Sequence, residues 1–211
     1  MNEDYQFNVK RKRPEDLYSS VFDYYDDETR AWYASSKSIV KTQEKITIRV
    51  LELLELDKEN SLILDCGCGP GFSSIYLHEL GYRTVALDII NEFFSYYSIN
   101  ELNPITADMC FPPFKDNSFD AIISISAFQW IYTNLQDKKM EHNLVNLIKS
   151  FHSILKPKSK VVIQFYPKNR ALMARIGNLI AKSSEFDGHY IIDNPDNPKK
   201  RKVYLILEKL H

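Results

Sequence analysis

The feature that most constrains the fold is an apolar run that ends in an acid and leads into a glycine-rich turn. Leu62–Asp65 is short and apolar, as buried strands are, and glycine then occupies every second position at Gly67, Gly69 and Gly71. A helical pattern begins at Phe72. Three glycines permit a tight turn from strand to helix and let a ligand lie on the backbone. The pattern therefore predicts a ligand-binding turn at the carboxyl edge of a parallel sheet.

Short apolar runs alternate with helical stretches along the rest of the chain. This alternation is typical of βαβ units and of a parallel sheet covered on both faces. The last two predicted strands, His189–Ile192 and Val203–Glu208, are joined by a loop too short for a helical crossover, so we expect them to pair antiparallel. The other predicted strands are Ser61–Asp65, Thr84–Asp88, Pro104–Ala107, Phe119–Ser124 and Lys160–Phe165, and the predicted helices begin at Ile39 and cover Phe72–Leu80, Asn91–Ile99, Lys138–Leu155 and Ala171–Ser183.

The chain is long and apolar enough for one domain. Its 211 residues, 44% of them apolar, allow a full core. We expect residues 39–211 to form this domain, and residues 1–38 to form an N-terminal arm and lid segment. Residues 1–16 are polar and include the basic cluster Lys10–Arg13, which favours a solvated, mobile arm over an RNA contact.

Composition excludes several classes of protein. The net charge of −1 provides no global basic field, so an RNA-binding surface has to be local or supplied by a partner. Three cysteines are too few for a disulfide framework, and no His/Cys set completes a metal site. We expect a cytoplasmic protein that is neither secreted nor embedded in a membrane, because no signal peptide and no spanning apolar run is present.

Acids at three successive strand ends indicate the kind of ligand. The G-x-G-x-G spacing after Asp65 departs from the G-x-G-x-x-G of pyrophosphate cradles. Asp65 is expected to orient an amino-acid moiety, and Asp88 to accept both ribose hydroxyls. Asp108 is expected to accept from an adenine amino group, with Met109 near the ring. Together they predict S-adenosyl-L-methionine, although NAD remains an alternative and each acid alone is compatible with a helix cap.

Three strings resemble the small-subunit ribosomal RNA (guanine-N7) methyltransferases. They are Asp65–Gly71, which many methyltransferases share, and the more particular Phe119–Trp130 and Gln164–Asn169. The similarity extends over nearly the whole chain from Arg13, and includes several positions of Tyr33–Arg49. The resemblance implies a Rossmann-like class I methyltransferase fold (α/β). Its sheet is seven-stranded and mostly parallel, in the order 3-2-1-4-5-7-6 with the last strand antiparallel, and helices cover both faces.

The residues that follow two predicted strands are expected to position the acceptor base. Methylation of guanine N7 needs no general base, because this atom carries a lone pair and no proton. Hydrogen bonds, stacking and phosphate contacts then suffice to hold the acceptor. An alternative for Trp130 is a place in the core, and Cys110 is expected to pack. The acceptor residues are Gln129, Trp130 or Phe128, Tyr166, Lys168 and Asn169, and the resemblance adds Tyr33, Ser36, Cys68, Ile89 and Ser124 to the cofactor site.

The sequence departs from the family pattern at three places. Ser38 stands where the family usually has an arginine, for which Lys37 is a candidate substitute without the guanidinium fork. Pro70 replaces a commoner serine and should stiffen the turn. The chain stops at His211, without the long basic tail of eukaryotic members. We therefore expect a compact or archaeal-type member for which nuclear import has no support.

The resemblance also implies two macromolecular partners. One is small-subunit rRNA, and the other is a small zinc-binding activator protein. The activator is expected to add a strand to the exposed edge at Asn103–Thr106, although Pro104 is alternatively a simple protection of that edge. Two other functions remain open, namely a small-molecule methyltransferase of the same fold and a ribosome-assembly factor without catalysis.

Overall fold

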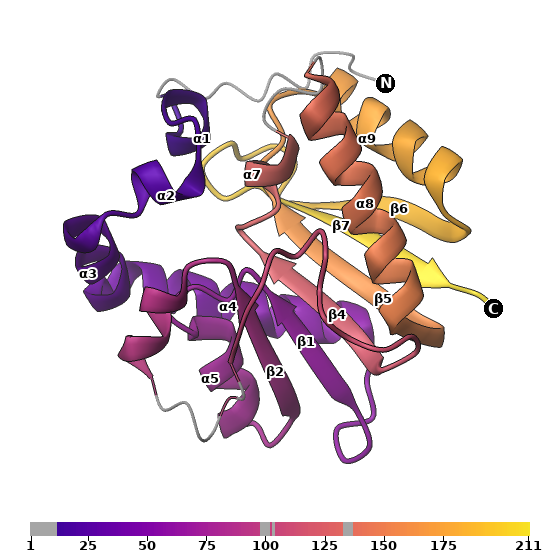
Figure 1. Ribbon diagram of the computed structural model, residues 1–211, viewed down its shortest axis with the longest axis horizontal. Helices are drawn as coiled ribbons and strands as arrows, with labels where there is room; N and C mark the ends of the chain where they lie inside the picture. Colours follow the sequence, from indigo (N-terminus) through magenta and orange to yellow (C-terminus); the bar gives the residue numbers. More distant parts are fainter. Residues whose placement is uncertain (1–11, 98–101, 103, 133–136) are drawn as a thin grey trace.

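The centre of the molecule is a seven-stranded sheet, seen in a computed structural model that describes residues 12–97, 102, 104–132 and 137–211. The strand order is β3-β2-β1-β4-β5-β7-β6 (Figure 1). All neighbours pair in parallel except β7, which runs antiparallel to both β5 and β6. The predicted order and the antiparallel final pair are confirmed. The strands are β1 (Leu62–Cys66), β2 (Arg83–Asp88), β3 (Ile105–Thr106), β4 (Phe119–Ile125), β5 (Leu155–Phe165), β6 (Phe186–Asp193) and β7 (Lys202–Lys209).

Helices cover both faces of this sheet, as predicted (Figure 1). One apolar cluster joins the sheet to α8 and α9, and a second joins the other face to α4 and α5. Among the described residues, no helix is both long enough and apolar enough to cross a membrane. The helices are α1 (Pro14–Leu17), α2 (Val21–Tyr24), α3 (Asp27–Ser35), α4 (Lys37–Leu54), α5 (Phe72–Glu79), α7 (Gln129–Tyr132), α8 (Lys138–Ile154) and α9 (Arg170–Ser183), and η1 (Asn91–Tyr96) is a 3-10 helix.

Two predicted elements differ from the structure. The predicted helix at Asn91–Ile99 is the 3-10 helix η1, and Ile99 lies outside the described residues. Strand β5 begins at Leu155, directly after α8, rather than at Lys160. In the first part of β5 the pairing with β4 shifts register between Phe119 and Ala121, and most side chains of this part are not buried. This part of the strand therefore needs no apolar pattern. Alternation therefore could not reveal it.

The prediction of a mobile arm over residues 1–16 is wrong for its last part, whereas Lys10 and Arg11 lie outside the described residues. The Arg13 guanidinium donates to the backbone carbonyl of Tyr166, and Asp16 forms an ion pair with Lys168. Glu15 between them is only 8% exposed. The segment is docked because its charges find partners on the loop after β5, a contact that local charge density does not reveal.

A buried ammonium group joins the end of β7 to the end of α8. Lys209 is 7% exposed, and its Nζ donates to Asn117 Oδ1 at 2.9 Å and to the carbonyls of His152 and Leu155 at 2.8 Å each. Three acceptors satisfy all three protons of an ammonium group. They include carbonyls at the carboxyl end of α8, where a cation is favoured by the helix dipole.

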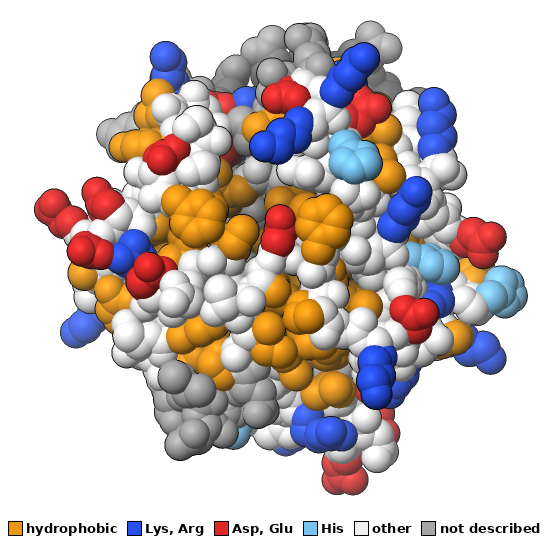
Figure 2. All heavy atoms as spheres, viewed as in Figure 1, with side chains coloured by type: hydrophobic (Ala, Val, Ile, Leu, Met, Phe, Trp, Pro, Cys, Tyr) orange, Lys and Arg blue, Asp and Glu red, His pale blue; other side chains and the backbone are white. Residues whose placement is uncertain are grey.

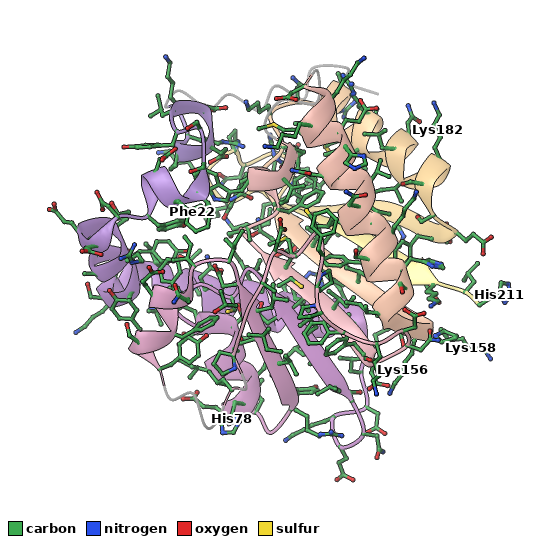
Figure 3. All side chains as sticks on the ribbon, in the orientation of Figure 1. Phe22, His78, Lys156, Lys158, Lys182 and His211 are labelled. Carbon is green, nitrogen blue, oxygen red and sulfur yellow. The ribbon has the colours of Figure 1, made fainter. Side chains whose placement is uncertain are left out.

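We predict that Lys209→Met destabilises the protein by about 2–3 kcal/mol, because it leaves buried acceptors without a donor. Urea unfolding followed by circular dichroism measures the change. The matched control is Lys182→Met on α9, whose side chain is exposed and points away from the body of the molecule (Figure 3). Equal stabilities of the two variants would contradict the role given to Lys209.

Candidate active site

The carboxyl edge of the parallel strands borders a cavity of about 380 Å³, here called the first cavity. The glycine turn contributes Gly67 and Gly69, and the ends of the next two strands contribute Asp88 and Asp108. Residues 18–22, which follow α1 and begin α2, also line it. Figure 2 shows hydrophobic side chains gathered across the middle of this face, and Figure 3 places Phe22 there. The first cavity thus lies where doubly wound folds bind their ligands.

The turn requires glycine for two different reasons. At Gly67 the backbone has φ +76°, and an added Cβ would lie 2.3 Å from Cβ of Ala127 in the loop after β4. At Gly71, with φ +84°, a Cβ would lie 2.7 Å from the ring of Tyr97. Gly71 precedes α5 as its N-cap and does not line the first cavity. Gly67 therefore permits a close approach of two loops, and Gly71 permits the entry into the helix.

Asp88 is held at the cavity wall by the backbone. Its Oδ2 accepts from the amide of Gly69 at 2.7 Å and its Oδ1 from the amide of Ile90 at 2.9 Å. Burial raises the pKa of Asp88 to about 6, and hydrogen bonds from the amides of Ile90, Gly69 and Ile89 oppose that rise. Each carboxylate oxygen has a further lone pair for a ligand hydroxyl. The side chain is thus oriented before any ligand arrives.

Asp65 lies behind the turn rather than in the cavity. It is 0% exposed, does not line the first cavity, and accepts from the hydroxyl of Ser74 at 2.6 Å. Burial raises its pKa to about 7. The prediction that Asp65 touches an amino-acid moiety therefore needs correction, because the carboxylate is buried behind the turn, where α5 bonds to Oδ2 and Oδ1 has no hydrogen-bond partner. Asp65 instead orients the beginning of that helix.

Two other predicted cofactor residues also lie away from the first cavity. Ser124 is 1% exposed inside β4, and Ser126, two residues later, lines the cavity in its place. Ser36 is the N-cap of α4, and its Oγ lies 3.2 Å from that of Ser38. Lys37 is exposed. The remaining predicted cofactor residues all line the first cavity, namely Tyr33, Gly67, Cys68, Gly69, Asp88, Ile89, Asp108 and Met109.

A second cavity of about 470 Å³ adjoins the first. The two share six lining residues, among them Glu15, Gln43, Ser126 and Trp130. Aromatic rings form much of the wall of the second cavity, and the ring centroids of Tyr24 and Trp130 are 5.8 Å apart. The aromatic lining residues are Tyr24, Tyr25, Tyr33, Trp130 and Tyr166. Such walls suit a flat ring that enters from solution.

The predicted acceptor residues divide into two groups. Trp130, Gln129 and Tyr166 line the second cavity. Lys168 and Asn169 do not line it: Lys168 pairs with Asp16, and Asn169 caps α9 by accepting from the amide of Leu172 at 2.8 Å. An asparagine before a helix is a common N-cap, so its role here is structural.

Phe128 is a core residue rather than a stacking platform. It is fully buried, with its ring centroid 4.7 Å from that of Tyr132 and 5.4 Å from that of Phe165. Trp130, two residues later, faces the cavities instead, because α7 begins at Gln129 and turns successive side chains to different sides. Cys110 is buried in the core, and burial raises the pKa of its thiol. It packs, as predicted.

A hydrogen-bonded network that sequence reasoning missed lies between the two cavities. Ser126 has φ +58°, and its hydroxyl donates to Gln164 Oε1 at 2.8 Å. The amide of Gln43 donates to the same hydroxyl at 3.4 Å. Each residue lies within a string that resembles the methyltransferase family, but no spacing rule joins α4, β4 and β5 at one point. The network holds the wall that both cavities share.

The described residues contain no cluster of three or more His, Cys, Asp or Glu side chains that could hold a metal ion. The fold and the cavities define the class of protein as a Rossmann-like class I methyltransferase. A protein-family model for a methyltransferase domain matches residues 64–163. Among solved structures, a candidate S-adenosyl-L-methionine-dependent methyltransferase from Methanococcus maripaludis aligns with TM-score 0.68 at 14% identity, over 96% of this chain and 97% of that chain.

Sequence comparison narrows this class to one family. The 18S rRNA (guanine(1575)-N(7))-methyltransferase of Saccharomyces cerevisiae is 37% identical over 192 residues, which cover 88% of this chain and 68% of the yeast protein. The chain belongs to the family of 18S rRNA (guanine-N7)-methyltransferases. It spans about two thirds of the length of the curated relatives it matches.

A further solved structure contains two proteins. It is the complex of the Haloferax volcanii Trm112 methyltransferase activator with a candidate methyltransferase. This chain aligns to it with TM-score 0.60 at 17% identity, over 89% of this chain and 100% of that chain.

We predict that Gly67→Ala destabilises the protein by about 2–4 kcal/mol, because the new Cβ meets Ala127 and forces a strained backbone. The matched control is Gly177→Ala on α9, where an added Cβ meets nothing within 4 Å. That control should gain about 0.5–1 kcal/mol as an ordinary helix substitution. Urea unfolding compares the two, and a loss below that of a typical surface substitution at Gly67 would contradict the close approach.

Proposed function

We propose that this protein transfers a methyl group from S-adenosyl-L-methionine to N7 of a guanine in small-subunit rRNA. The observation that carries the proposal is the pair of adjoining cavities. The first presents a glycine turn with Asp88 and Asp108, and the second presents an aromatic wall. A donor and a flat acceptor bound side by side across Ser126 and Trp130 would be held in reach of each other, which is most of what such a displacement requires.

The first cavity fits the proposed donor. Asp88, already oriented by two amides, accepts the ribose hydroxyls, and Asp108 accepts from the adenine amino group. Met109 and Ile89 enclose the adenine, and Gly67 lets the rest of the molecule lie against the backbone. Among the described lining residues Lys139 is the only Lys or Arg, and the turn departs from the G-x-G-x-x-G spacing of a pyrophosphate cradle, which disfavours the NAD alternative. The bound donor supplies an electrophilic methyl group on a sulfonium.

The chemistry asked of the protein is modest. Guanine N7 attacks with its own lone pair, so no side chain has to remove a proton. The protein has to align the base, exclude water and leave room for the positive charge to move. The segment formed by α1 and α2 lines part of the first cavity, and Trp130 with Tyr166 offers faces for stacking. The absence of an obvious base is therefore consistent with the proposed reaction.

Basic side chains around the second cavity support an RNA substrate. Arg13 lies 5.9 Å and Lys202 5.3 Å from the ring centroid of Tyr166. Lys168 is on the same loop and is 38% exposed, and the basic run 199–202 leads into β7. A chain with a net charge of −1 thus gathers cations at one place, where they can contact phosphates.

A partner protein at the sheet edge is part of the proposal. Strand β3 pairs only with β2 among the described strands, so its other side is free for another strand. Two large apolar side chains close to β3 in the sequence are exposed, Tyr96 by 42% and Phe111 by 62%. The Haloferax complex supports an activator of the Trm112 kind as the partner. Asn103 of the predicted edge lies outside the described residues. Pro104 alone offers only weak edge protection.

The proposed activity predicts incorporation of labelled methyl groups from S-adenosyl-L-methionine into small subunits isolated from a strain that lacks the protein. The activator is added in parallel reactions, and mass spectrometry of the rRNA should find 7-methylguanosine. Asp88→Ala should abolish incorporation while circular dichroism shows an unchanged fold. Label that appears only in small molecules would favour a small-molecule methyltransferase, and failure to bind the donor even with the activator would favour an assembly factor without catalysis.

We also predict that donor affinity falls at acid pH. The ribose hydroxyls need an ionised Asp88, whose pKa lies at about 6 in the free protein, so binding is strong above that pH and weakens as pH falls through it. The dissociation constant should rise about tenfold per pH unit below this value. Calorimetry with S-adenosylhomocysteine between pH 8 and pH 5 measures it. Asp88→Asn should bind weakly at every pH, and a wild-type affinity that is flat across this range would contradict the assignment.

A further inference from the structure

Glu15 is a buried acid that the donor site does not use. It follows Pro14 at the start of α1 and is 8% exposed. Among the described residues its one ion pair is with Arg13, whose Nη1 lies 3.8 Å from Oε1, beyond hydrogen-bond distance. The same guanidinium donates to the carbonyl of Tyr166. The backbone amide of Glu15 itself hydrogen-bonds to the carboxylate, which leaves further lone pairs open at a place where a charge is costly, and this suggests that a ligand supplies further donors.

The position of Glu15 is as informative as its burial. It lines both cavities, and within the second it shares the wall with Tyr24, Tyr33 and Trp130. The aromatic surroundings exclude water and thereby strengthen a hydrogen bond to a charged group. Burial is also the main reason that the pKa of Glu15 is raised, while a hydrogen bond from its own backbone amide and the charge of Arg13 oppose the rise. A flat ring between these aromatic side chains would present its edge to the wall that contains this carboxylate.

Guanine alone among the four RNA bases has two adjacent donors on its Watson–Crick edge, N1–H and the 2-amino group. Two parallel donors match the two oxygens of a carboxylate. Adenine and cytosine present an unprotonated ring nitrogen at the corresponding position, which a carboxylate repels, and uracil offers a single donor. N7 lies on the other side of the purine, so a grip on the Watson–Crick edge leaves the methyl acceptor uncovered.

We propose that Glu15 is the residue that selects guanine in the second cavity, by accepting hydrogen bonds from N1–H and the 2-amino group. The inference rests on the proposed function and deepens it. Glu15 takes no part in the transfer itself and contacts only the acceptor. Its carboxylate makes the second cavity specific for one base, whereas the aromatic walls accept any flat ring.

The test compares guanosine with inosine, which lacks only the 2-amino group. Single-turnover methylation is measured at saturating donor on a synthetic RNA hairpin that carries either nucleoside at the mapped site. Wild-type protein should methylate the inosine hairpin roughly ten- to a hundredfold more slowly, because one hydrogen bond to a charged group is lost. Glu15→Ala should be slow on both hairpins, with a ratio near one, and Glu15→Gln should also lose most of the discrimination.

The matched control is Glu28→Ala, which truncates an exposed glutamate of α3 outside both cavities and should keep the wild-type ratio. The ratio of the guanosine rate to the inosine rate is insensitive to a loss of donor affinity. The donor is saturating, and each variant is measured on both hairpins. A Glu15→Ala protein that still discriminates as wild type does would overturn the inference alone and leave Glu15 as a helix-terminal acid. A wild-type protein that methylates neither hairpin nor small subunits would overturn the proposed function and this inference with it.

Discussion

The active site depends on the attachment of the glycine turn to the strand beside it. The amides of Gly67 and Cys68 both donate to the carbonyl of Leu87, at 2.8 and 3.1 Å, and the amide of Gly69 donates to Asp88 at 2.7 Å. The turn and the end of β2 therefore form one rigid unit. This unit aims backbone and carboxylate at the same space, so the cavity is already shaped for its ligand.

This arrangement contains buried acidic side chains, and burial disfavours their charged form. Asp65, Asp88 and Glu15 are each under a tenth exposed, and burial raises the pKa of each. Ser74 donates to Oδ2 of Asp65, whose Oδ1 is buried without a hydrogen-bond partner, and backbone amides donate to both oxygens of Asp88. Glu15 has a hydrogen bond from its own backbone amide and lines both cavities, whereas Asp65 lines neither, and this difference in position separates a structural acid from one that is poised for a ligand.

The N-terminal segment completes the second cavity from a distance in sequence. The contacts of Arg13 with Tyr166 and of Asp16 with Lys168 join residues about 150 positions apart. They place Glu15 in the lining of both cavities, together with Tyr33 and Trp130. Ser126, held between Gln43 and Gln164, forms the wall common to both cavities. Acceptor and donor sites thus share residues, which couples the docking of the segment to the geometry of both.

The sequence by itself determined the sheet, the glycine turn and the acids Asp88 and Asp108, because strand periodicity and turn chemistry are local and leave a readable pattern. Tertiary structure decided which side chains reach the cavities. Asp65 and Asn169 accept hydrogen bonds from the first turns of α5 and α9. Phe128 and Ser124 are buried. The residues that the packing adds to the site are Glu15, Gln43 and Ser126. These outcomes depend on contacts between elements far apart in the chain. No local spacing encodes such contacts, since burial is settled only when the layers pack.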